Sequence, residues 1–178
     1  MNRTSTSLAT HLLPPARYER ERELHRATII DRKRGRRVRL GDCVSVVFED
    51  RETLLYQAHE IRRIECANNE ARFAEELAFL NRLVPVPNRL TLTLYVDGSC
   101  EGTCHEVAEV LSADPSKLNL IADGAHFPAT ALDEGLFPAG SVRYLGIEIP
   151  RVAATAPILA LYCDCYRATA RIPAGILR

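Results

Sequence analysis

Hydrophobic residues recur at helical spacing in the middle of the chain, directly after a short run that is typical of a strand. Cys43 to Phe48 is rich in β-forming residues and predicts a strand that ends in a charged turn. The helix that follows starts at Glu52 or Thr53 and carries an apolar stripe on one side. The stripe consists of Leu54, Leu55, Ala58 and Ile61.

A second apolar stripe predicts another helix after the break at Asn68-Asn69. Its members are spaced four, three and four residues apart: Phe73, Leu77, Leu80 and Val84. Pro85 and Pro87 end it, because proline removes a helical hydrogen bond. The two stripes together predict an antiparallel helical hairpin.

Alternation with a period of two predicts strands elsewhere. In the run Leu90 to Val96 the leucines and the valine face one way, and the threonines and Tyr95 face the other. Further short strands are expected at residues 36–40, 118–121, 142–149 and 158–166. The stretch between Asp123 and Gly140 is rich in glycine, proline and alanine and is expected to be a loop. Strands and helices do not alternate regularly, which favours an α+β fold with an antiparallel or mixed sheet and helices on one side.

The N-terminal part reads as an arm on a single domain. Residues 1–15 are expected to be a flexible leader, and residues 16–178 a single α+β domain. Within it, residues 16–40 form a basic helical arm packed on the body, with the helix from Ala16 to about Lys33. Its expected inner face is Leu24, Ala27 and Ile30, and Gly35 is expected to end it.

Charge is unevenly spread along a chain of zero net charge. Through Asp42 there are eleven basic and five acidic residues, and the rest holds twelve basic and eighteen acidic. The arm is therefore expected to dock on the acidic body, at Glu49 and Asp50 among others, or to bind an anionic or protein partner. The arginines that would do so are Arg32, Arg34, Arg36, Arg37 and Arg39. Nucleic-acid binding is disfavoured, since no aromatic residues are interleaved with the run to stack on bases.

The lengths of the apolar runs predict where in the cell the protein is located. No run approaches the length of a transmembrane helix, and the N-terminus lacks the apolar core of a signal peptide. We therefore expect a cytoplasmic protein without membrane contact. Its six cysteines would then be reduced thiols or metal ligands.

The helix after Phe48 carries the densest group of polar side chains. The candidate residues on or beside its polar face are Glu49, Arg51, Tyr56, Gln57, His59, Glu60 and Arg63. A histidine near carboxylates can transfer protons or bind a metal. The alternative is an ordinary polar face held by ion pairs along the helix.

Cysteines and histidines offer a second candidate. Cys100, Cys104 and His105 are residue types that hold zinc or iron, although their spacing is not the usual Cys-x-x-Cys. Cys100 and Cys104 could alternatively form a redox-active pair. Cys163 and Cys165 are expected on one strand, facing the core with Leu159 and Leu161, as small buried hydrophobes.

Several segments together resemble an uncharacterised bacterial family catalogued as domain of unknown function 3501. The matching segments are residues 18–20, 29–30, 32–42, 48–53, 56–57, Glu60, 75–77, Asn81, Pro85 and 90–94, with weaker matches at 133–135 and 142–145. Residues 97–106 are not part of the resemblance. It implies a context of rubrerythrin-like and iron–sulfur or flavin-linked oxidoreductase proteins.

Function is expected to follow that context. Because the chain shows no complete catalytic constellation, the favoured reading is a non-catalytic accessory protein of a redox or oxidative-stress system. Its partner would be a rubrerythrin-like or iron–sulfur oxidoreductase. A metal-dependent enzyme or metal sensor is the alternative, and nucleic-acid binding through the arginines is a second alternative.

Overall fold

The computed structural model describes residues 7–65, 67–97, 101–133, 142–149 and 157–176. The chain divides into two compact units. A helical unit comprises residues 1–35 and 49–86, and a sheet unit comprises residues 36–48 and 87–178. The chain therefore passes between the units after Gly35, Phe48 and Val86.

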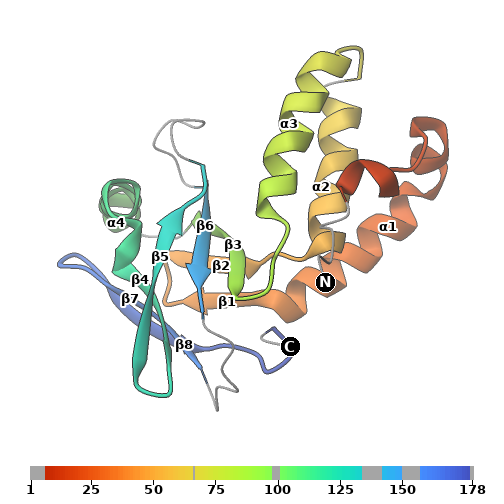
Figure 1. Ribbon diagram of the computed structural model, residues 1–178. Helices are drawn as coiled ribbons and strands as arrows, with labels where there is room; N and C mark the ends of the chain where they lie inside the picture. Colours follow the sequence, from red (N-terminus) through yellow and green to blue (C-terminus); the bar gives the residue numbers. More distant parts are fainter. Residues whose placement is uncertain (1–6, 66, 98–100, 134–141, 150–156, 177–178) are drawn as a thin grey trace. The chain divides into compact units, whose positions relative to one another are not determined.

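The helical unit contains the predicted hairpin. Helices α2 (Arg51–Ile64) and α3 (Glu70–Leu83) lie side by side (Figure 1). Each is capped at its start by a side chain, Asp50 for α2 and Asn69 for α3, which accepts a hydrogen bond from a free backbone N–H of the first turn. Their buried faces include Leu54 and Ala58 of α2 together with Phe73 and Leu80 of α3, as the apolar stripes predict.

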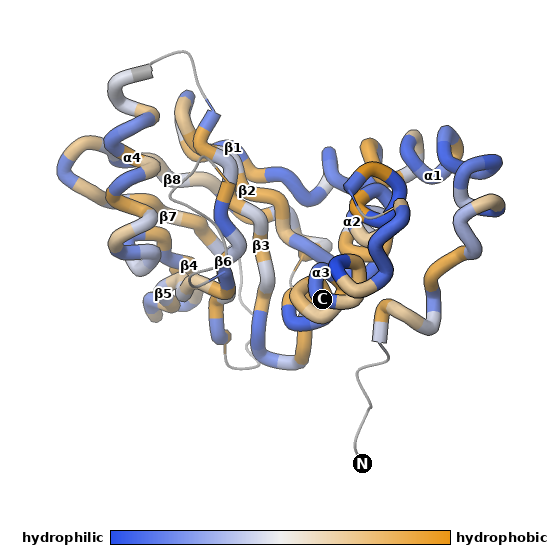
Figure 2. Tube along the Cα trace, turned by 90° about the horizontal axis from the view of Figure 1, so that it is seen from above, coloured by the Kyte–Doolittle hydropathy of each residue, from blue (hydrophilic) through white to orange (hydrophobic). Residues whose placement is uncertain are grey.

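The basic helix α1 (Pro15–Arg36) packs through a different face from the expected one. Figure 2 shows α1 as a mostly hydrophilic helix. Leu24 is 72% exposed and Ile30 is 51% exposed, so the prediction of Leu24, Ala27 and Ile30 as the inner face was wrong. Tyr18 and Ile29 are buried instead. They belong to a stripe that also holds polar residues, and a pattern of apolar positions alone does not reveal such a stripe.

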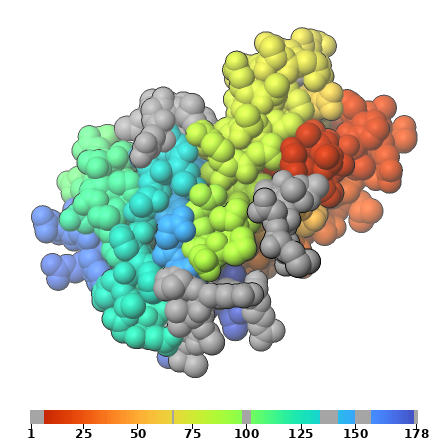
Figure 3. All heavy atoms as spheres, viewed as in Figure 1, coloured from red at the N-terminus to blue at the C-terminus, as the bar shows by residue number. Residues whose placement is uncertain are grey.

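The end of α1 and the segment before it also differ from expectation. The helix continues through Gly35 to Arg36, so Gly35 does not end it. Part of the expected leader is folded, because Leu8–His11 forms a 3₁₀ turn, η1, whose Leu8 side chain is buried. The backbone N–H of Leu8 donates to Asn81 Oδ1 of α3 at 2.8 Å, and the red η1 segment lies against α3 in Figure 3.

Within its described residues, the sheet unit is built on one antiparallel sheet of eight strands. The strand order is β1-β2-β3-β6-β5-β4-β7-β8. The strands are β1 (Arg37–Leu40), β2 (Val44–Phe48), β3 (Arg89–Val96), β4 (Leu118–Ala122), β5 (Ala125–Ala131), β6 (Val142–Glu148), β7 (Ile158–Tyr162) and β8 (Arg167–Arg171). Helix α4 (Glu101–Ala113) and the short 3₁₀ turn η2 (Pro115–Lys117) lie between β3 and β4 in the chain. The expected α+β class, antiparallel sheet, helical hairpin and basic N-terminal helix are thus confirmed.

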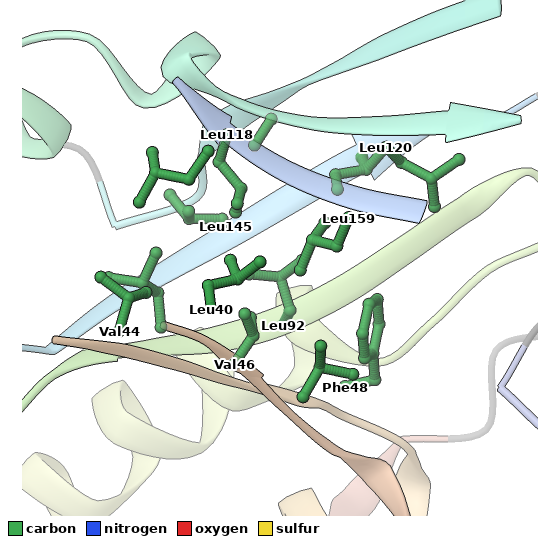
Figure 4. Packing of buried hydrophobic residues seen from close by; sticks show 14 of the residues in the cluster. Leu40, Val44, Val46, Phe48, Leu92, Leu118, Leu120, Leu145 and Leu159 are labelled. Carbon is green, nitrogen blue, oxygen red and sulfur yellow. The ribbon is translucent and has the colours of Figure 1, made fainter. Parts of the chain in front are cut away.

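The hydrophobic core lies against one face of this sheet. Pairing Phe48 with Leu92, and Leu92 with Leu145, aligns large side chains across β2, β3 and β6. Leucines of β1, β4 and β7 meet them in the same cluster (Figure 4). Helix α4 adds Val107 and Leu111. Each such side chain contributes about 1.5–3 kcal/mol when it leaves water.

The sheet curls so that its two edge strands approach each other. Tyr166, just before β8, donates from its hydroxyl to the Leu40 carbonyl at 2.6 Å. The same hydroxyl accepts from the Cys43 backbone N–H at 3.1 Å. These contacts join the turn after β1 to the start of β8, which covers groups that an open sheet edge would expose.

Two strands lie where the sequence pattern predicts none. The stretch expected to be a loop contains β5, which pairs with β4 and β6. Only Ala129 of β5 is buried, so the strand lacks an apolar pattern and forms through its neighbours. Its hairpin turn at Asp123-Gly124 uses positive φ at both residues, 49° and 79°. The last expected strand ends at Tyr162, and the chain then reverses into β8.

Candidate functional site

The start of α2 shows how the polar residues of this helix are held. The Asp50 side chain accepts from the Thr53 N–H at 3.0 Å, and the Thr53 hydroxyl accepts from the Asp50 N–H at 2.9 Å. This reciprocal capping begins the helix at Arg51. Buried Glu49 accepts from the Thr53 hydroxyl and from Gln57 Nε2, the latter at 3.3 Å. Glu49 and Gln57, both predicted site residues, are therefore engaged within the helical unit.

His59 lies inside the helical unit against an aromatic neighbour. Its ring stacks on Tyr18 with the centroids 4.2 Å apart and the planes 8° from parallel. Tyr18 also faces His25, at 5.8 Å between centroids. The Leu13 N–H donates to His59 Nε2 at 3.4 Å, which places the proton of the neutral ring on Nδ1. Burial lowers the pKa of His59 to about 4, so the ring is neutral near pH 7.

Glu60 is the centre of a charged network between α1 and α2. Arg22 donates to it from Nε and from a terminal nitrogen, both at 2.9 Å, and the Tyr18 hydroxyl donates at 2.8 Å. Arg63 completes the group from the next turn of α2. The Arg22 hydrogen bonds, more than the other contacts, lower the pKa of Glu60 to about 2. Burial, followed by the hydrogen bond to Glu60, raises the pKa of Tyr18 well above its ordinary value. The network therefore holds a fixed ion pair and does not supply a proton donor near pH 7.

A small cavity of about 150 Å³ opens beside this network. Its lining consists of His11, Leu13, Tyr18, His25, Ile29, Glu52, Leu55, Tyr56 and His59. Of the candidate residues predicted on the polar face of α2, Tyr56 and His59 line this cavity. Sequence reasoning missed the contribution of α1, because Tyr18 and His25 stand far from α2 in the chain.

Acid is expected to destabilise the fold in two separable pH ranges. Between pH 6.5 and about 4, His59 binds a proton in the unfolded chain but not in the folded one. Its contribution to the free energy of unfolding is therefore complete above pH 6.5 and is lost as the pH falls towards about 4. Glu60 has a depressed pKa, so its contribution is complete above pH 4.5 and is lost towards about pH 2. Either group changes the unfolding free energy by at most about 1.4 kcal/mol per pH unit.

Urea denaturation across this pH range checks the assignment. His59→Phe keeps a ring to stack on Tyr18 and should flatten the pH dependence only in the upper range. Glu60→Gln should flatten it only in the lower range. His105→Gln, at an exposed histidine of α4, is the control and should change neither. An unaltered upper slope in His59→Phe would contradict the buried, neutral state of His59.

The five arginines of the basic run occupy separate environments. In the helical unit, Arg32 pairs with Asp50 at 2.7 Å, and Arg34 pairs with Asp31 at 3.1 Å on the surface. In the sheet unit, Arg36 donates to the Phe48 carbonyl at 2.7 Å. Arg37 donates to Ser45 Oγ and lies over the Tyr95 ring, and Arg39 reaches the Asp42 carbonyl at 3.4 Å. Arg32 thus makes the contact with Asp50 that the docking alternative expects.

The proposed Cys–His metal site receives no structural support within the described residues. Cys100 lies outside them. Cys104 is partly buried against the core, and His105 is exposed and faces Glu109 at 3.4 Å. Across the described ranges, no group of three or more histidine, cysteine, aspartate or glutamate side chains could hold a metal ion. No helix in the same ranges has the length and apolar character to cross a membrane.

The structure places Cys163 and Cys165 in a hairpin, whereas the sequence pattern predicts both of them on one strand. They stand at the tip of the β7–β8 hairpin, where Cys163 and Tyr166 exchange two backbone hydrogen bonds around the loop Asp164-Cys165. Their positions on one strand were therefore wrongly predicted, because β7 ends at Tyr162. Cys163 is buried and Cys165 is half-buried, with the sulfur atoms 3.4 Å apart. Neither is in a disulfide.

This pair lines an open groove of about 550 Å³ in the sheet unit. The groove is bounded by α4, by Lys117 of η2 and by the hairpin. Its lining consists of Glu106, Glu109, Val110, Lys117, Tyr162, Cys163, Asp164, Cys165 and Arg167. Burial, more than the contact with Cys163, raises the pKa of Cys165 above its ordinary value, and Glu106 adds to the effect. The groove therefore combines two adjacent thiols with charged side chains of both signs.

Comparison with known proteins connects both units to one family. Residues 8–157 match the family described as "Protein of unknown function (DUF3501)", which confirms the resemblance found in the sequence. The comparison with curated proteins finds no match.

A solved structure is also similar to the chain. It is a crystal structure of a novel protein of unknown function from Burkholderia pseudomallei, 28% identical in sequence with a TM-score of 0.75. The similarity covers 93% of this chain and 92% of that chain.

Proposed function

We propose that this chain, which belongs to the DUF3501 family of proteins of unknown function, is a cytoplasmic accessory protein of a bacterial redox system. Its working group would be the dithiol of Cys163 and Cys165. The redox context comes from the family resemblance, in which rubrerythrin-like and iron–sulfur proteins are the expected partners. The two thiols can undergo reversible oxidation to a disulfide, which is a reaction that suits a redox system.

One observation carries the proposal, the sulfur–sulfur distance of 3.4 Å in an open groove. A disulfide has sulfur atoms about 2.05 Å apart, so oxidation requires the two sulfurs to approach by little more than an ångström. Cys165 lies in a two-residue hairpin loop and Cys163 directly precedes it, and such a loop can adjust more easily than a strand held on both sides. The polar groups of α2 are a weaker choice, since Glu49, Gln57 and Glu60 are already engaged within the helical unit.

The two thiols have different expected roles in exchange with a disulfide. Cys165 is the more exposed and would attack first as the thiolate, which breaks the S–S bond of the oxidant and releases one thiol. Cys163 would then attack the mixed disulfide and release the second thiol. The protein dithiol is oxidised by two electrons, and the incoming disulfide is reduced to two thiols.

The environment of Cys165 restrains this reaction near neutral pH. Its raised pKa leaves a small thiolate fraction at pH 7, and the fraction grows as the pH rises. We therefore expect slow exchange at neutral pH and faster exchange in alkali. Glu106→Gln removes a nearby negative charge and should increase the rate of exchange with a neutral disulfide near pH 7, whereas Glu75→Gln, in the helical unit, should not.

Oxidation of the purified full chain tests the proposal. The protein would be equilibrated with mixtures of reduced and oxidised glutathione, quenched by alkylation and mapped by peptide mass spectrometry. We expect a peptide linked internally between Cys163 and Cys165, with the loss of two hydrogens. Cys163→Ser and Cys165→Ser should each abolish it, and Cys104→Ser, at a partly buried cysteine of α4, should not.

Two outcomes would refute this function. In one, Cys163 and Cys165 stay reduced across the whole range of glutathione mixtures while the protein remains folded. In the other, the linkage forms between other cysteines, and Cys163→Ser has no effect on it. Either result would leave the pair as the small buried side chains that the sequence pattern suggests.

A further inference from the structure

We infer that the groove beside Cys163 and Cys165 admits a small zwitterionic disulfide, such as the disulfide of a thiol-containing peptide. The inference rests on the proposed redox function of the pair and names the class of molecule with which it exchanges. Its evidence is the size of the groove and the arrangement of charge around the sulfurs.

The size of the groove favours a small molecule over a folded protein as the direct oxidant. Its volume of about 550 Å³ lies within the range typical of small-molecule sites, which is about 300–1,000 Å³. Cys163 and Cys165 both line this hollow, so a small disulfide that enters the groove lies beside the Cys165 sulfur that attacks it.

The charges around the sulfurs are of both signs. Glu106 and Glu109 lie on α4, Asp164 lies between the two cysteines, and Lys117 and Arg167 line the same groove. Lys117 faces Asp114 at 3.5 Å and Glu109 faces His105 at 3.4 Å, so these two already have neighbours of opposite charge. Arg167 is exposed beside the hairpin and is suited to hold a carboxylate of the ligand. Glu106 is suited to hold an ammonium group.

This arrangement distinguishes a zwitterion from simpler disulfides. A neutral disulfide would leave Glu106 and Arg167 without ligand contacts. A cationic disulfide would satisfy the carboxylates but would face Arg167 with like charge. A molecule with carboxylate and ammonium groups on either side of its sulfur can contact both, which gives specificity through complementary charge.

The experiment compares three disulfides as oxidants of the reduced full chain. The probes are oxidised glutathione, which carries both carboxylate and ammonium groups, cystamine, which is cationic, and 2-hydroxyethyl disulfide, which is neutral. The rate of formation of the Cys163–Cys165 linkage is measured for each and divided by its rate with a small reference thiol of similar pKa. This ratio removes differences in intrinsic reactivity among the probes. We expect the highest ratio for oxidised glutathione.

A matched pair of variants in β8 assigns the effect to the groove. Arg167→Gln should reduce the ratio for oxidised glutathione by about threefold to tenfold and leave the neutral probe unchanged. Arg171→Gln changes an exposed arginine of the same strand that does not line the groove, and should affect neither.

Every outcome decides the question. A highest ratio for cystamine or for the neutral probe, or equal effects of the two arginine variants, would overturn the zwitterionic specificity while the dithiol function stands. Failure of all three probes to oxidise the pair would refute the redox function itself. The two hypotheses therefore fail in distinguishable ways.

Discussion

Replacing Asp133 with alanine is expected to lower the free energy of unfolding by about 3–5 kcal/mol, because it leaves a largely buried guanidinium without its counter-ion. The Asp133 side chain is fully buried and accepts from Arg143 Nε at 3.0 Å and from a terminal nitrogen at 2.9 Å. It also accepts from the Tyr144 N–H at 2.9 Å. The carboxylate thus joins the end of β5 to the start of β6 and satisfies a backbone donor.

Urea denaturation at neutral pH measures this loss. The control is Asp31→Ala, which removes an exposed pair with Arg34 and should cost less than about 1 kcal/mol. In a double variant, Asp133→Leu with Arg143→Met, both charges are gone, and much of the stability should return. A loss below about 1 kcal/mol in Asp133→Ala would show that Arg143 regains solvent easily.

Gly41→Ala is the second substitution expected to have a large effect, a loss of about 2–5 kcal/mol in the free energy of unfolding. Gly41 has a φ of 63°, a left-handed conformation that costs other residues about 1–2 kcal/mol. A methyl group there would lie only 2.2 Å from the Tyr166 hydroxyl oxygen. That hydroxyl bonds the backbone on both sides of the turn after β1, so the added methyl would displace it. Overpacking of this kind typically costs a further 1–3 kcal/mol or so.

Thermal or urea unfolding of two glycine variants separates these causes. Gly35→Ala serves as the control, because Gly35 lies in α1 with no atom within 4 Å of the added methyl. It should stabilise the helix by about 0.5–1 kcal/mol. Adding Tyr166→Phe to Gly41→Ala removes the closest atom and should recover part of the overpacking loss. If Gly41→Ala were as stable as the parent protein, the described contact with Tyr166 would be refuted.

Gly41 also bears on the dithiol. Tyr166 directly follows Cys165, and its hydroxyl is held at the turn between β1 and β2. Displacing Tyr166 would therefore alter the hairpin that brings the two sulfurs together. We expect Gly41→Ala to change the rate of Cys163–Cys165 oxidation as well as the stability.

Local patterns in the sequence were enough to predict the helices and strands that bury one apolar face. The stripes of α2 and α3 and the alternation in β3 each reflect a side chain period that is a geometric property of the element. Strand β5 was missed for the opposite reason. Its side chains are mostly exposed, so its pairing with β4 and β6 leaves no mark in the pattern of hydrophobic residues. The start of α2 was placed only approximately, because it was expected at Glu52 or Thr53, whereas the capping by Asp50 and Thr53 begins the helix at Arg51.

The candidate sites depended much more on contacts between distant segments. His59 was visible as a residue with reactive chemistry, but its low pKa comes from burial, and its stacking partner Tyr18 comes from another helix. Cys163 and Cys165 were visible as a Cys-x-Cys pair, but the sequence placed them on a strand. The reversal of the chain at Asp164 brings the sulfurs together beside α4, and no local signal in the sequence marks that groove.

The sequence by itself determined the class of the fold, the helical hairpin, the main strands and the family to which the chain belongs. These follow from local periodicity, helix-ending prolines and segments that match the family, each of which extends over a few residues at a time. Only the tertiary structure decided which face of α1 is buried, how the sheet curls onto Tyr166 and where two thiols meet a groove. Those features depend on residues far apart in the chain, and their energies arise only when folding removes the groups from water and brings them into contact.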